Sequence, residues 1–244
     1  MTAPPHDIGF LPIVYRLAGR LEQLTWEELS DDVTSSTFAL RSAQQLFGLP
    51  VVVSHFRLGV EGEACGARVE RDSTGSITGS GTATAPLPAG QDLLDATPLA
   101  QVLEVTARLS TEFRDDVAVA GVLSGPRSLQ SVLPVDAAEL TQLYAVLARA
   151  YLERGARLLI VAEDPVLGVG SQQDVSLNPL LNVAGYFGAQ VIVLDELPRD
   201  QVLPLDELAR EPNRSWRGRP VVTDGEVPQD LPAEHLSAWL KELS

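Results

Sequence analysis

Residues 155–164 of the chain read GARLLIVAED, and this stretch decides the fold class. The run from Leu158 to Ala162 is wholly apolar, and two acids, Glu163 and Asp164, follow it. A strand that is apolar along its whole length is buried on both faces, which is typical of a parallel sheet covered by helices. The residues before it, from about Asp136 to Arg154, predict a helix, so the stretch predicts one helix–strand unit of an α/β protein.

Similar units recur along the chain. Apolar, β-branched runs predict further strands at Val51–Phe56, Val117–Leu123, Val191–Leu194 and Pro220–Thr223. The stretches between them predict helices at Thr25–Phe47, Leu99–Phe113, Pro179–Phe187 and residues 233–243. The first of these helices opens with Thr25-x-x-Glu28, a capping-box pattern.

The fold prediction is a (β/α)8 TIM-type barrel that forms one domain over residues 1–244. Barrels of this type commonly have about 250 residues, so the 244 residues are enough for one. Five strands are clear in the sequence, which leaves the barrel shortened and its other strands irregular, short or absent. Residues 68–84 alternate and turn on Ser-Thr-Gly, which predicts a small β-hairpin added to the barrel.

Composition excludes several classes of partner. The formal net charge of −15 and the pI near 4.5 argue against nucleic acid, because binding to phosphate needs clustered Lys and Arg. No apolar stretch is long enough for a membrane span, and the N-terminal residues do not resemble a signal peptide, so a cytoplasmic protein is expected. Cys65 is the only cysteine, which excludes a disulfide within the chain. Small-molecule chemistry is the remaining expectation.

Five segments, in order along the chain, resemble the uroporphyrinogen decarboxylase-like superfamily. This superfamily includes uroporphyrinogen decarboxylase, the corrinoid methyltransferases and barrels of the cobalamin-independent methionine synthase type. The segment with Arg16 and Arg20 is similar to the MRQAGRY segment near the start of the decarboxylase, and the E-x-E-A-x-G ending of residues 55–66 is closer to the corrinoid methyltransferases. The segments are YRLAGRL (15–21), HFRLGVEGEACG (55–66), AVAGVLSGPRSL (118–129), GARLLIVAEDP (155–165) and VVTDGEVPQDLPAEHL (221–236). The resemblance implies the barrel fold in a chain shorter than most members.

The chain also departs from this family at residues that carry its chemistry. Arg57 stands where the resemblance implies an aspartate that contacts the pyrrole NH groups, Val132 where it implies a tyrosine, and Asp224 where it implies a late histidine. Porphyrinogen decarboxylation is therefore not expected. The zinc site of the methyltransferase branch uses a His-x-Cys pair and a distant Cys, and the three histidines and one cysteine here do not have that spacing. Neither a metal nor a cofactor is predicted.

Active sites of parallel barrels lie at the carboxyl ends of the strands, so polar residues at those ends are the site candidates. His55, Asp164 and Asp224 are predicted to move protons. The predicted substrate-binding residues come from the strand ends and from the segment with the two arginines: Arg16, Arg20, Arg57, Ser124, Glu163 and Asp195. Arginine suits the binding of carboxylates because its planar fork donates two parallel hydrogen bonds. Acids that end strands also act simply as helix caps, and this alternative stays open for each of them.

Three functions stay open at this point. The first is a metal-independent lyase of the decarboxylase type that acts on a small acidic molecule, with Arg57 free to receive the anion rather than tied in a structural ion pair. The second is a non-catalytic barrel that partners a corrinoid protein or a paralogue. The third is a methyltransferase without the usual zinc site. A deep pocket with convergent charged groups would favour an enzyme over an accessory subunit. Family members often pair, so a homodimer is a further expectation.

Overall fold

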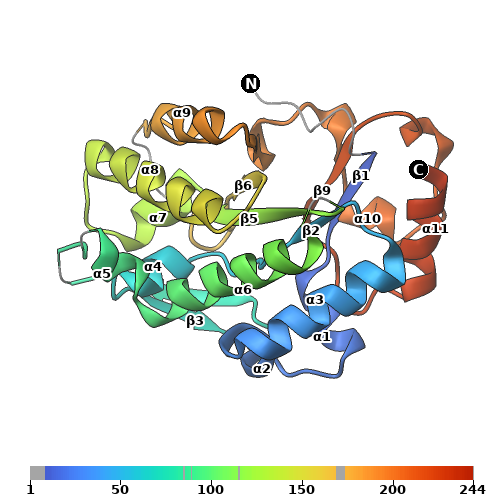
Figure 1. The fold of residues 1–244 in the computed structure, drawn as a ribbon, viewed down its shortest axis with the longest axis horizontal. Coiled ribbons are helices and arrows are strands. Elements are labelled where there is room, and N and C mark those ends of the chain that lie inside the picture. Colours follow the sequence, from blue (N-terminus) through green and yellow to red (C-terminus); the bar gives the residue numbers. More distant parts are fainter. Residues whose placement is uncertain (1–8, 85, 89, 115, 169–173, 244) are drawn as a thin grey trace.

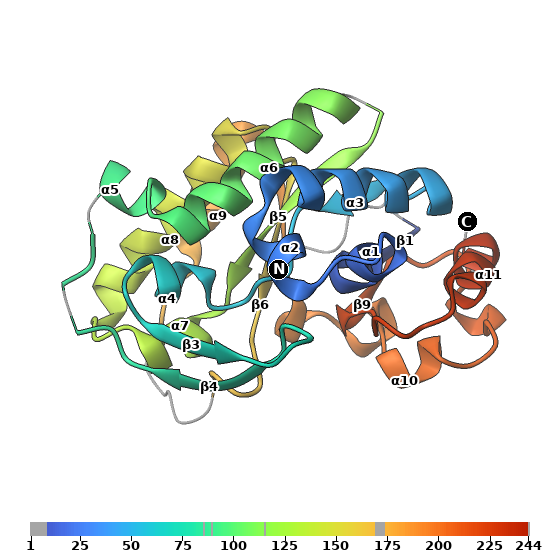
Figure 2. The same ribbon diagram turned by 90° about the horizontal axis from the view of Figure 1, so that it is seen from below.

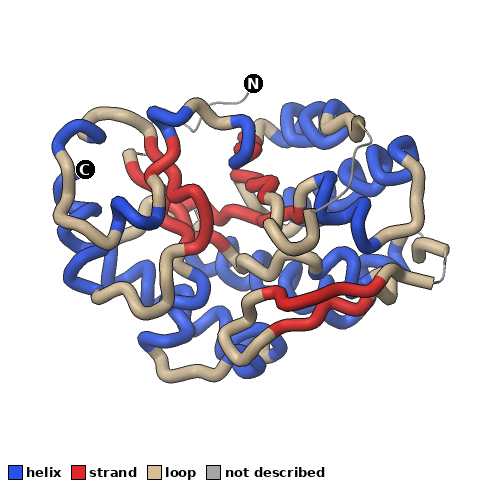
Figure 3. Tube along the Cα trace, turned by 180° about the vertical axis from the view of Figure 1, so that it is seen from behind, coloured by secondary structure: helices blue, strands red, loops and turns tan. Residues whose placement is uncertain are grey.

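The computed structural model describes residues 9–84, 86–88, 90–114, 116–168 and 174–243. Helices surround a central group of strands, and a separate hairpin lies to one side (Figures 1 and 3). The mixed α/β class predicted from the sequence is confirmed, because parallel strands alternate with helices along the chain. None of the described helices is both long enough and apolar enough to cross a membrane.

Seven parallel strands form two sheets in the described part of the chain. One sheet has the order β2–β5–β6–β7 and the other β1–β9–β8. The strands are β1 (Phe10–Ile13), β2 (Val51–Val53), β5 (Ala118–Ser124), β6 (Leu158–Ala162), β7 (Gln190–Val193), β8 (Val202–Leu203) and β9 (Val221–Glu226). The strands thus follow one another in chain order around an incomplete ring, as in a barrel.

The barrel is not closed, so the predicted (β/α)8 TIM-type barrel is not confirmed. Among the described residues, no hydrogen-bonded ladder joins β1 to β2 or β7 to β8. After β7 the chain turns through two 3₁₀ segments, Leu194–Glu196 and Arg199–Gln201, and β8 then has only two residues. Few backbone groups are therefore left to pair across that gap, because each residue of a strand supplies one N–H and one C=O.

All five predicted strands are present, and four of them have shifted ends. Leu158–Ala162 has the predicted bounds, whereas the predicted strand Val51–Phe56 ends at Val53. The chain leaves the ladder there because the Nδ1 atom of His55 accepts a hydrogen bond from the backbone N–H of Arg57, 3.2 Å away, which closes a local turn. Strands β1 and β8 were not predicted, because four and two residues are too short to show a periodic pattern.

Helices cover both sheets. They are α1 (Tyr15–Leu21), α2 (Trp26–Asp31), α3 (Val33–Phe47), α4 (Val60–Ala64), α5 (Gln91–Leu94), α6 (Thr97–Phe113), α7 (Pro126–Val132), α8 (Ala137–Glu153), α9 (Asn178–Phe187), α10 (Leu205–Leu208) and α11 (Ala233–Leu243). Long helices α3 and α6 pack against each other (Figure 2). Side chains alternate along the strands, so that Val51 and Val53 join one hydrophobic core while Val52 joins the other.

The helix predicted at Thr25–Phe47 is two helices. Its capping box is present, since the Thr25 side chain accepts from the Glu28 N–H and the Glu28 carboxylate accepts from the Thr25 N–H. Asp32 interrupts the helix with extended backbone and caps α3, where its carboxylate accepts from Thr34 N at 2.9 Å. An aspartate at this position is a better N-cap than an interior helical residue.

The predicted hairpin is formed by β3 (Arg68–Arg71) and the antiparallel β4 (Ile77–Gly81). In the turn between them, Asp72 Oδ1 accepts from the N–H groups of Thr74 and Ser76. Gly75 has a φ of +83°, and a Cβ there would lie 2.2 Å from a ring carbon of Trp26. Only glycine therefore permits both this turn and its close approach to the Trp26 ring. These contacts hold the hairpin turn against α2.

Candidate functional site

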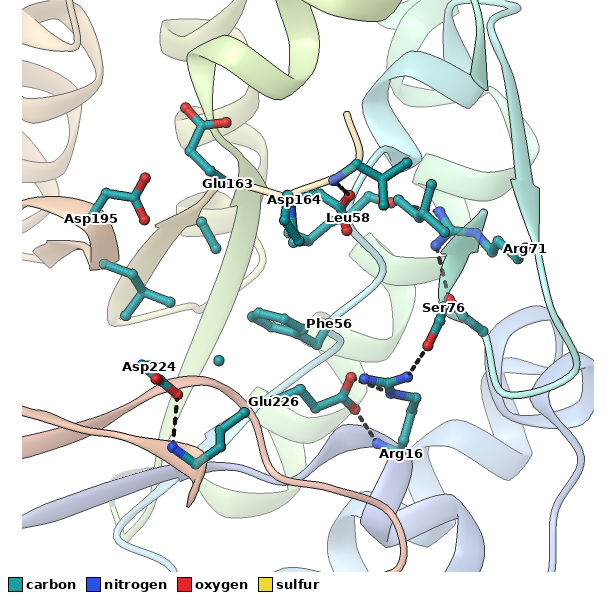
Figure 4. A pocket seen from close by; sticks show the side chains of 18 of the residues that line it. Arg16, Phe56, Leu58, Arg71, Ser76, Glu163, Asp164, Asp195, Asp224 and Glu226 are labelled. Carbon is teal, nitrogen blue, oxygen red and sulfur yellow. Dashed lines mark hydrogen bonds and ion pairs between the residues drawn. The ribbon is translucent and has the colours of Figure 1, made fainter. Parts of the chain in front are cut away.

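A cavity of about 480 Å³ lies at the carboxyl ends of the strands, as expected for a parallel barrel. Strand ends supply most of its wall (Figure 4), and the hairpin, Trp26, Arg16 of α1 and Leu205 of α10 supply the rest. Its polar side chains are Arg16, Arg71, Ser76, Glu163, Asp164, Asp195, Asp224 and Glu226. Five of the nine residues predicted from the sequence border it: Arg16, Glu163, Asp164, Asp195 and Asp224. The volume suits a small molecule.

Arg16 and Glu226 form a buried ion pair in the wall of this cavity. Arg16 Nε lies 2.6 Å from Glu226 Oε2, and the backbone N–H of Arg16 donates to Oε1 of the same carboxylate. The Glu226 side chain is 3% exposed and the Arg16 side chain 25%. Burial raises the pKa of Glu226 to about 7, although Arg16 acts against this rise. Glu226 therefore exchanges a proton near neutral pH.

Three further carboxylates, Glu163, Asp164 and Asp195, follow β6 and β7 and lie across the cavity from Arg16 in the view of Figure 4. Glu163 accepts from the N–H groups of Arg127 and Ser128 at the start of α7, and Arg127 also pairs with Asp195. Asp164 Oδ1 accepts from two backbone N–H groups of the turn that follows β6. Glu163 and Asp164 thus also cap local structure, which is the alternative that the sequence left open.

Asp224 also borders the cavity and lies on β9, two residues before Glu226. Its Oδ1 atom accepts from the backbone N–H of Leu205 at 3.1 Å. Partial burial raises the pKa of Asp224, and the nearby Asp206 raises it further. Glu226 and Asp224 are therefore two groups of raised pKa on one strand end, a pattern that is common at sites of proton transfer.

The hairpin closes the side of the cavity next to Arg16. Arg16 Nη1 donates to Ser76 Oγ at 2.8 Å, so the guanidinium links Glu226 to the hairpin turn. Arg71 donates to the carbonyl oxygen of Leu58 at 2.5 Å and lies over the Trp26 ring. It also lies 3.5 Å from Glu63, a carboxylate outside the cavity wall.

Arg57 differs from its expected state, because it is held in ion pairs. Its guanidinium lies 2.9 Å from Asp31 and 3.0 Å from Glu63, and it donates to the carbonyl oxygen of Ser30 at 3.3 Å. Its side chain is 12% exposed. The predicted role in anion binding required that the Arg57 guanidinium be free to donate to a ligand. Its hydrogen bonds and ion pairs with Asp31, Glu63 and Ser30 leave it unavailable for that role.

Arg20 also lies apart from the residues that border the cavity. It is exposed, and its Nη2 atom donates to the carbonyl oxygen of Leu231 at 3.0 Å, in the segment before α11. Arg16 and Arg20 both lie on α1, as their spacing suggested, but only Arg16 borders the cavity. The structure therefore separates the two arginines that the resemblance placed together.

His55 is a packed core residue. It is 1% exposed, its ring stacks on Tyr151, and its Nε2 atom lies 2.7 Å from the Tyr151 hydroxyl oxygen. Burial and the nearby Arg57 lower the pKa of His55 to about 3, so the imidazole is neutral at physiological pH. His55 does not border the cavity, and the contacts do not support the proton-transfer role predicted for it.

Replacing Tyr151 with phenylalanine tests this structural role of His55. We expect the free energy of unfolding to fall by about 1–3 kcal/mol, because the buried Nε2 atom loses its partner. Urea unfolding measures the change. Tyr186→Phe is the matched control, because Tyr186 is 84% exposed, and it should change stability by less than about 0.5 kcal/mol. Equal small effects of the two substitutions would contradict the role.

Ser124 belongs to a buried hydrogen-bond network rather than to the cavity wall. Its hydroxyl donates to Glu61 at 2.5 Å and accepts from the N–H of Gly59 at 2.7 Å, and its carbonyl oxygen accepts from Tyr144. Glu61 is fully buried, and this burial raises its pKa. The network joins β5 to α4 and α8, so its contacts indicate a structural role.

Sequence reasoning missed several residues of the cavity, including Phe56, Arg71, Ser76 and Glu226. The prediction ended the last strand at Thr223, whereas β9 continues to Glu226. Polar residues at the true end of that strand include Glu226, so a longer strand prediction would have found it. The sequence carries no local signal that the hairpin folds over the cavity.

The residues do not fit the zinc site that the resemblance of the sequence to corrinoid methyltransferases implies. Cys65 is buried, and burial together with Glu61 raises the pKa of its thiol to about 12, so the thiol stays protonated. His55 is engaged by Tyr151 and Arg57. Within the described residues, no group of three or more His, Cys, Asp or Glu is placed to hold a metal ion. Zinc ligands are thiolate, imidazole or carboxylate groups that converge on one point.

Comparisons with known proteins identify the fold but no family. No model of a protein family matches the sequence, and no curated protein matches it. A solved structure described as a methyltransferase from Methanosarcina mazei has the same fold, with a TM-score of 0.66 and 17% sequence identity. The match covers 100% of this chain and 94% of that chain. At this identity the likeness concerns the fold alone and assigns neither a family nor an activity to this chain.

Proposed function

We propose that this protein is a methyltransferase-like enzyme that binds a small molecule in the strand-end cavity and uses Glu226 for proton transfer. One observation carries the proposal: a buried carboxylate, Glu226, whose pKa burial raises to about 7, borders a cavity at the strand ends of a methyltransferase-like fold. General acid–base catalysis works best with a group whose pKa is near the working pH.

The cavity favours an enzyme over an accessory subunit. It has a volume of about 480 Å³, and charged groups from α1, from β9, from the ends of β6 and β7 and from the hairpin converge on it. An accessory subunit that only binds a partner protein would not need such a cavity. A filled or flat surface at the strand ends would have supported that role.

The arginine contacts do not favour a decarboxylase that acts on an acidic molecule. Binding of substrate carboxylates needs guanidinium groups that are free to donate. Arg16 is held by Glu226 and Ser76, and Arg57 by Asp31 and Glu63. Ligand carboxylates would have to compete with these internal partners.

The proposed step is a methyl transfer coupled to loss of a proton. The acceptor atom, bonded to hydrogen, gives its proton to the Glu226 carboxylate, and its electron pair forms the new bond to the methyl carbon. The bond from that carbon to the donor breaks, and its electron pair stays with the donor. Arg16 orients the carboxylate during this step through its Nε and backbone N–H groups.

Transfer of a labelled methyl group tests the proposal. The protein is incubated with ¹³C-methylcobalamin and a panel of small thiols, amines and alcohols, and ¹³C NMR follows the label. Glu226→Gln and Val166→Trp should slow transfer at least tenfold, the first by removing the proton acceptor and the second by filling the cavity that Val166 borders. Phe38→Trp is the control, because Phe38 is an exposed residue of α3 away from the cavity.

Two results would contradict the proposal. Transfer no faster than in the absence of protein would exclude methyl transfer among these reactants. Equal rates for wild type, Glu226→Gln and Val166→Trp would place the reaction outside this cavity.

A further inference from the structure

The charges around the cavity are unequal. Five carboxylates border it, at Glu163, Asp164, Asp195, Asp224 and Glu226, against the two guanidinium groups of Arg16 and Arg71. Arg16 is paired with Glu226, and Arg71 lies beside Glu63, which is outside the cavity wall. The cations of the wall are therefore already balanced by carboxylates of the protein.

Two of the carboxylates, Asp164 and Asp224, accept hydrogen bonds from backbone groups and form no ion pair with a guanidinium among the described residues, although Asp164 is near enough to Arg71 to oppose the lowering of that guanidinium's pKa by burial. Asp164 uses Oδ1 to accept from Val166 N and Leu167 N, and Asp224 uses Oδ1 to accept from Leu205 N. By contrast, Arg127 pairs with both Glu163 and Asp195. Each of these two aspartates thus has one oxygen engaged by the backbone, and both side chains carry negative charge toward the cavity.

An aromatic ring lies between these two aspartates. In Figure 4 the Phe56 ring lies at the centre of the cavity, with Asp164 on one side of it and Asp224 on the other. Leu58, Leu194 and Leu205 add apolar wall. The face of an aromatic ring attracts a cation. Nearby carboxylates also attract it, and this attraction offsets the loss of water contacts when the cation enters the cavity.

We propose that the cavity selects a positively charged small molecule, either an amine or a compound that has a quaternary ammonium group together with an O–H or S–H group, with its charge between Asp164 and Asp224 and against Phe56. This inference names the substrate class of the proposed enzyme, and it rests on the proposed function for the position of the site. It differs from the acidic ligand expected from the sequence, because the arginines on which that expectation depended are occupied by internal carboxylates.

Isosteric pairs of compounds test the charge preference. Choline is compared with 3,3-dimethylbutan-1-ol, which has the same shape without the charge, and both are compared with 3,3-dimethylbutanoate. Tetramethylammonium and methylammonium are measured alongside. Titration calorimetry should show that the wild type binds the best cation at least tenfold more tightly than its neutral counterpart, and the anion more weakly still.

Neutral variants of the two aspartates locate the charge. Asp164→Asn and Asp224→Asn keep an oxygen that accepts from the backbone N–H groups, so the fold should be retained. Each should weaken binding of the cation at least threefold, and the double variant at least tenfold, with little effect on the neutral compound. Glu104→Gln is the matched control, because it removes one negative charge from an exposed residue of α6. It should leave all affinities unchanged.

The outcomes separate this inference from the proposed function. Preference for the neutral or anionic compound, with binding blocked by Val166→Trp, would overturn the cation preference and leave the cavity as the site. Unchanged cation affinity in the double aspartate variant would also overturn it. If no compound of any charge binds to the wild type, both the inference and the proposed use of the cavity fail.

Discussion

Replacing Arg16 with methionine is expected to lower the free energy of unfolding by about 3 kcal/mol or more at pH 8. The substitution leaves the Glu226 carboxylate, whose side chain is 3% exposed, without its guanidinium partner. Removal of one partner of a buried ion pair typically costs about 3–5 kcal/mol, because a charge stays buried without compensation. Urea unfolding followed by circular dichroism measures the change.

The loss should be smaller at pH 5 than at pH 8, because Glu226 can then bind a proton and stay buried as a neutral acid. Arg41→Met is the matched control. Arg41 pairs with Glu112, and both side chains are more than a third exposed, so its removal should change stability by less than about 1 kcal/mol. Equal losses for Arg16→Met and Arg41→Met would show that the buried pair contributes no more than a surface pair.

The pH dependence of stability should contain a contribution from Glu226. Burial raises the pKa of Glu226 in the folded protein from 4.5 to about 7, so the folded state binds the proton more tightly than the unfolded state. The sign follows from this: the stabilisation is fully present below about pH 4.5 and is lost as the pH rises to about 7. A difference of this size between the two pKa values corresponds to about 3 kcal/mol.

Glu226→Gln isolates this contribution, because glutamine does not titrate. The free energy of unfolding of the wild type minus that of Glu226→Gln should fall by about 3 kcal/mol between pH 4.5 and 7.5. Taking the difference removes the contributions of other buried acids such as Glu61. Glu104→Gln, at an exposed position, should show a constant difference from the wild type. A constant difference for Glu226→Gln as well would mean that Glu226 is ionised throughout this range in the folded protein.

Much of the local structure could be predicted from the sequence. The strand at Leu158–Ala162 is confirmed with its bounds, because a run of five apolar residues has the length of a buried strand and is too short for a typical helix. The hairpin and the Thr25 capping box were also identifiable, since each depends on residues within a few positions of one another. Prediction was weaker where elements are short, as in β1 and β8.

The candidate site was predicted in part, where it depends on the positions of the strand ends. Asp164, Asp195 and Asp224 follow predicted strands and do border the cavity, because parallel strands end at one edge. His55 also follows a strand, but it packs on Tyr151, 96 positions away in the chain. The sequence does not reveal that distant partner, so it could not separate a packed histidine from a catalytic one.

The sequence by itself determined the α/β class, the position of most strands and helices, and the gathering of acids at the strand ends, because these depend on local hydrophobic pattern and chain direction. The tertiary structure alone decided which charges remain available to a ligand. Glu226 neutralises Arg16 across 210 positions, and Asp31 pairs with Arg57 across 26. The electrostatic energy of an ion pair depends on distance in space and on burial rather than on separation along the chain, so only the folded arrangement distinguishes a free arginine from a paired one.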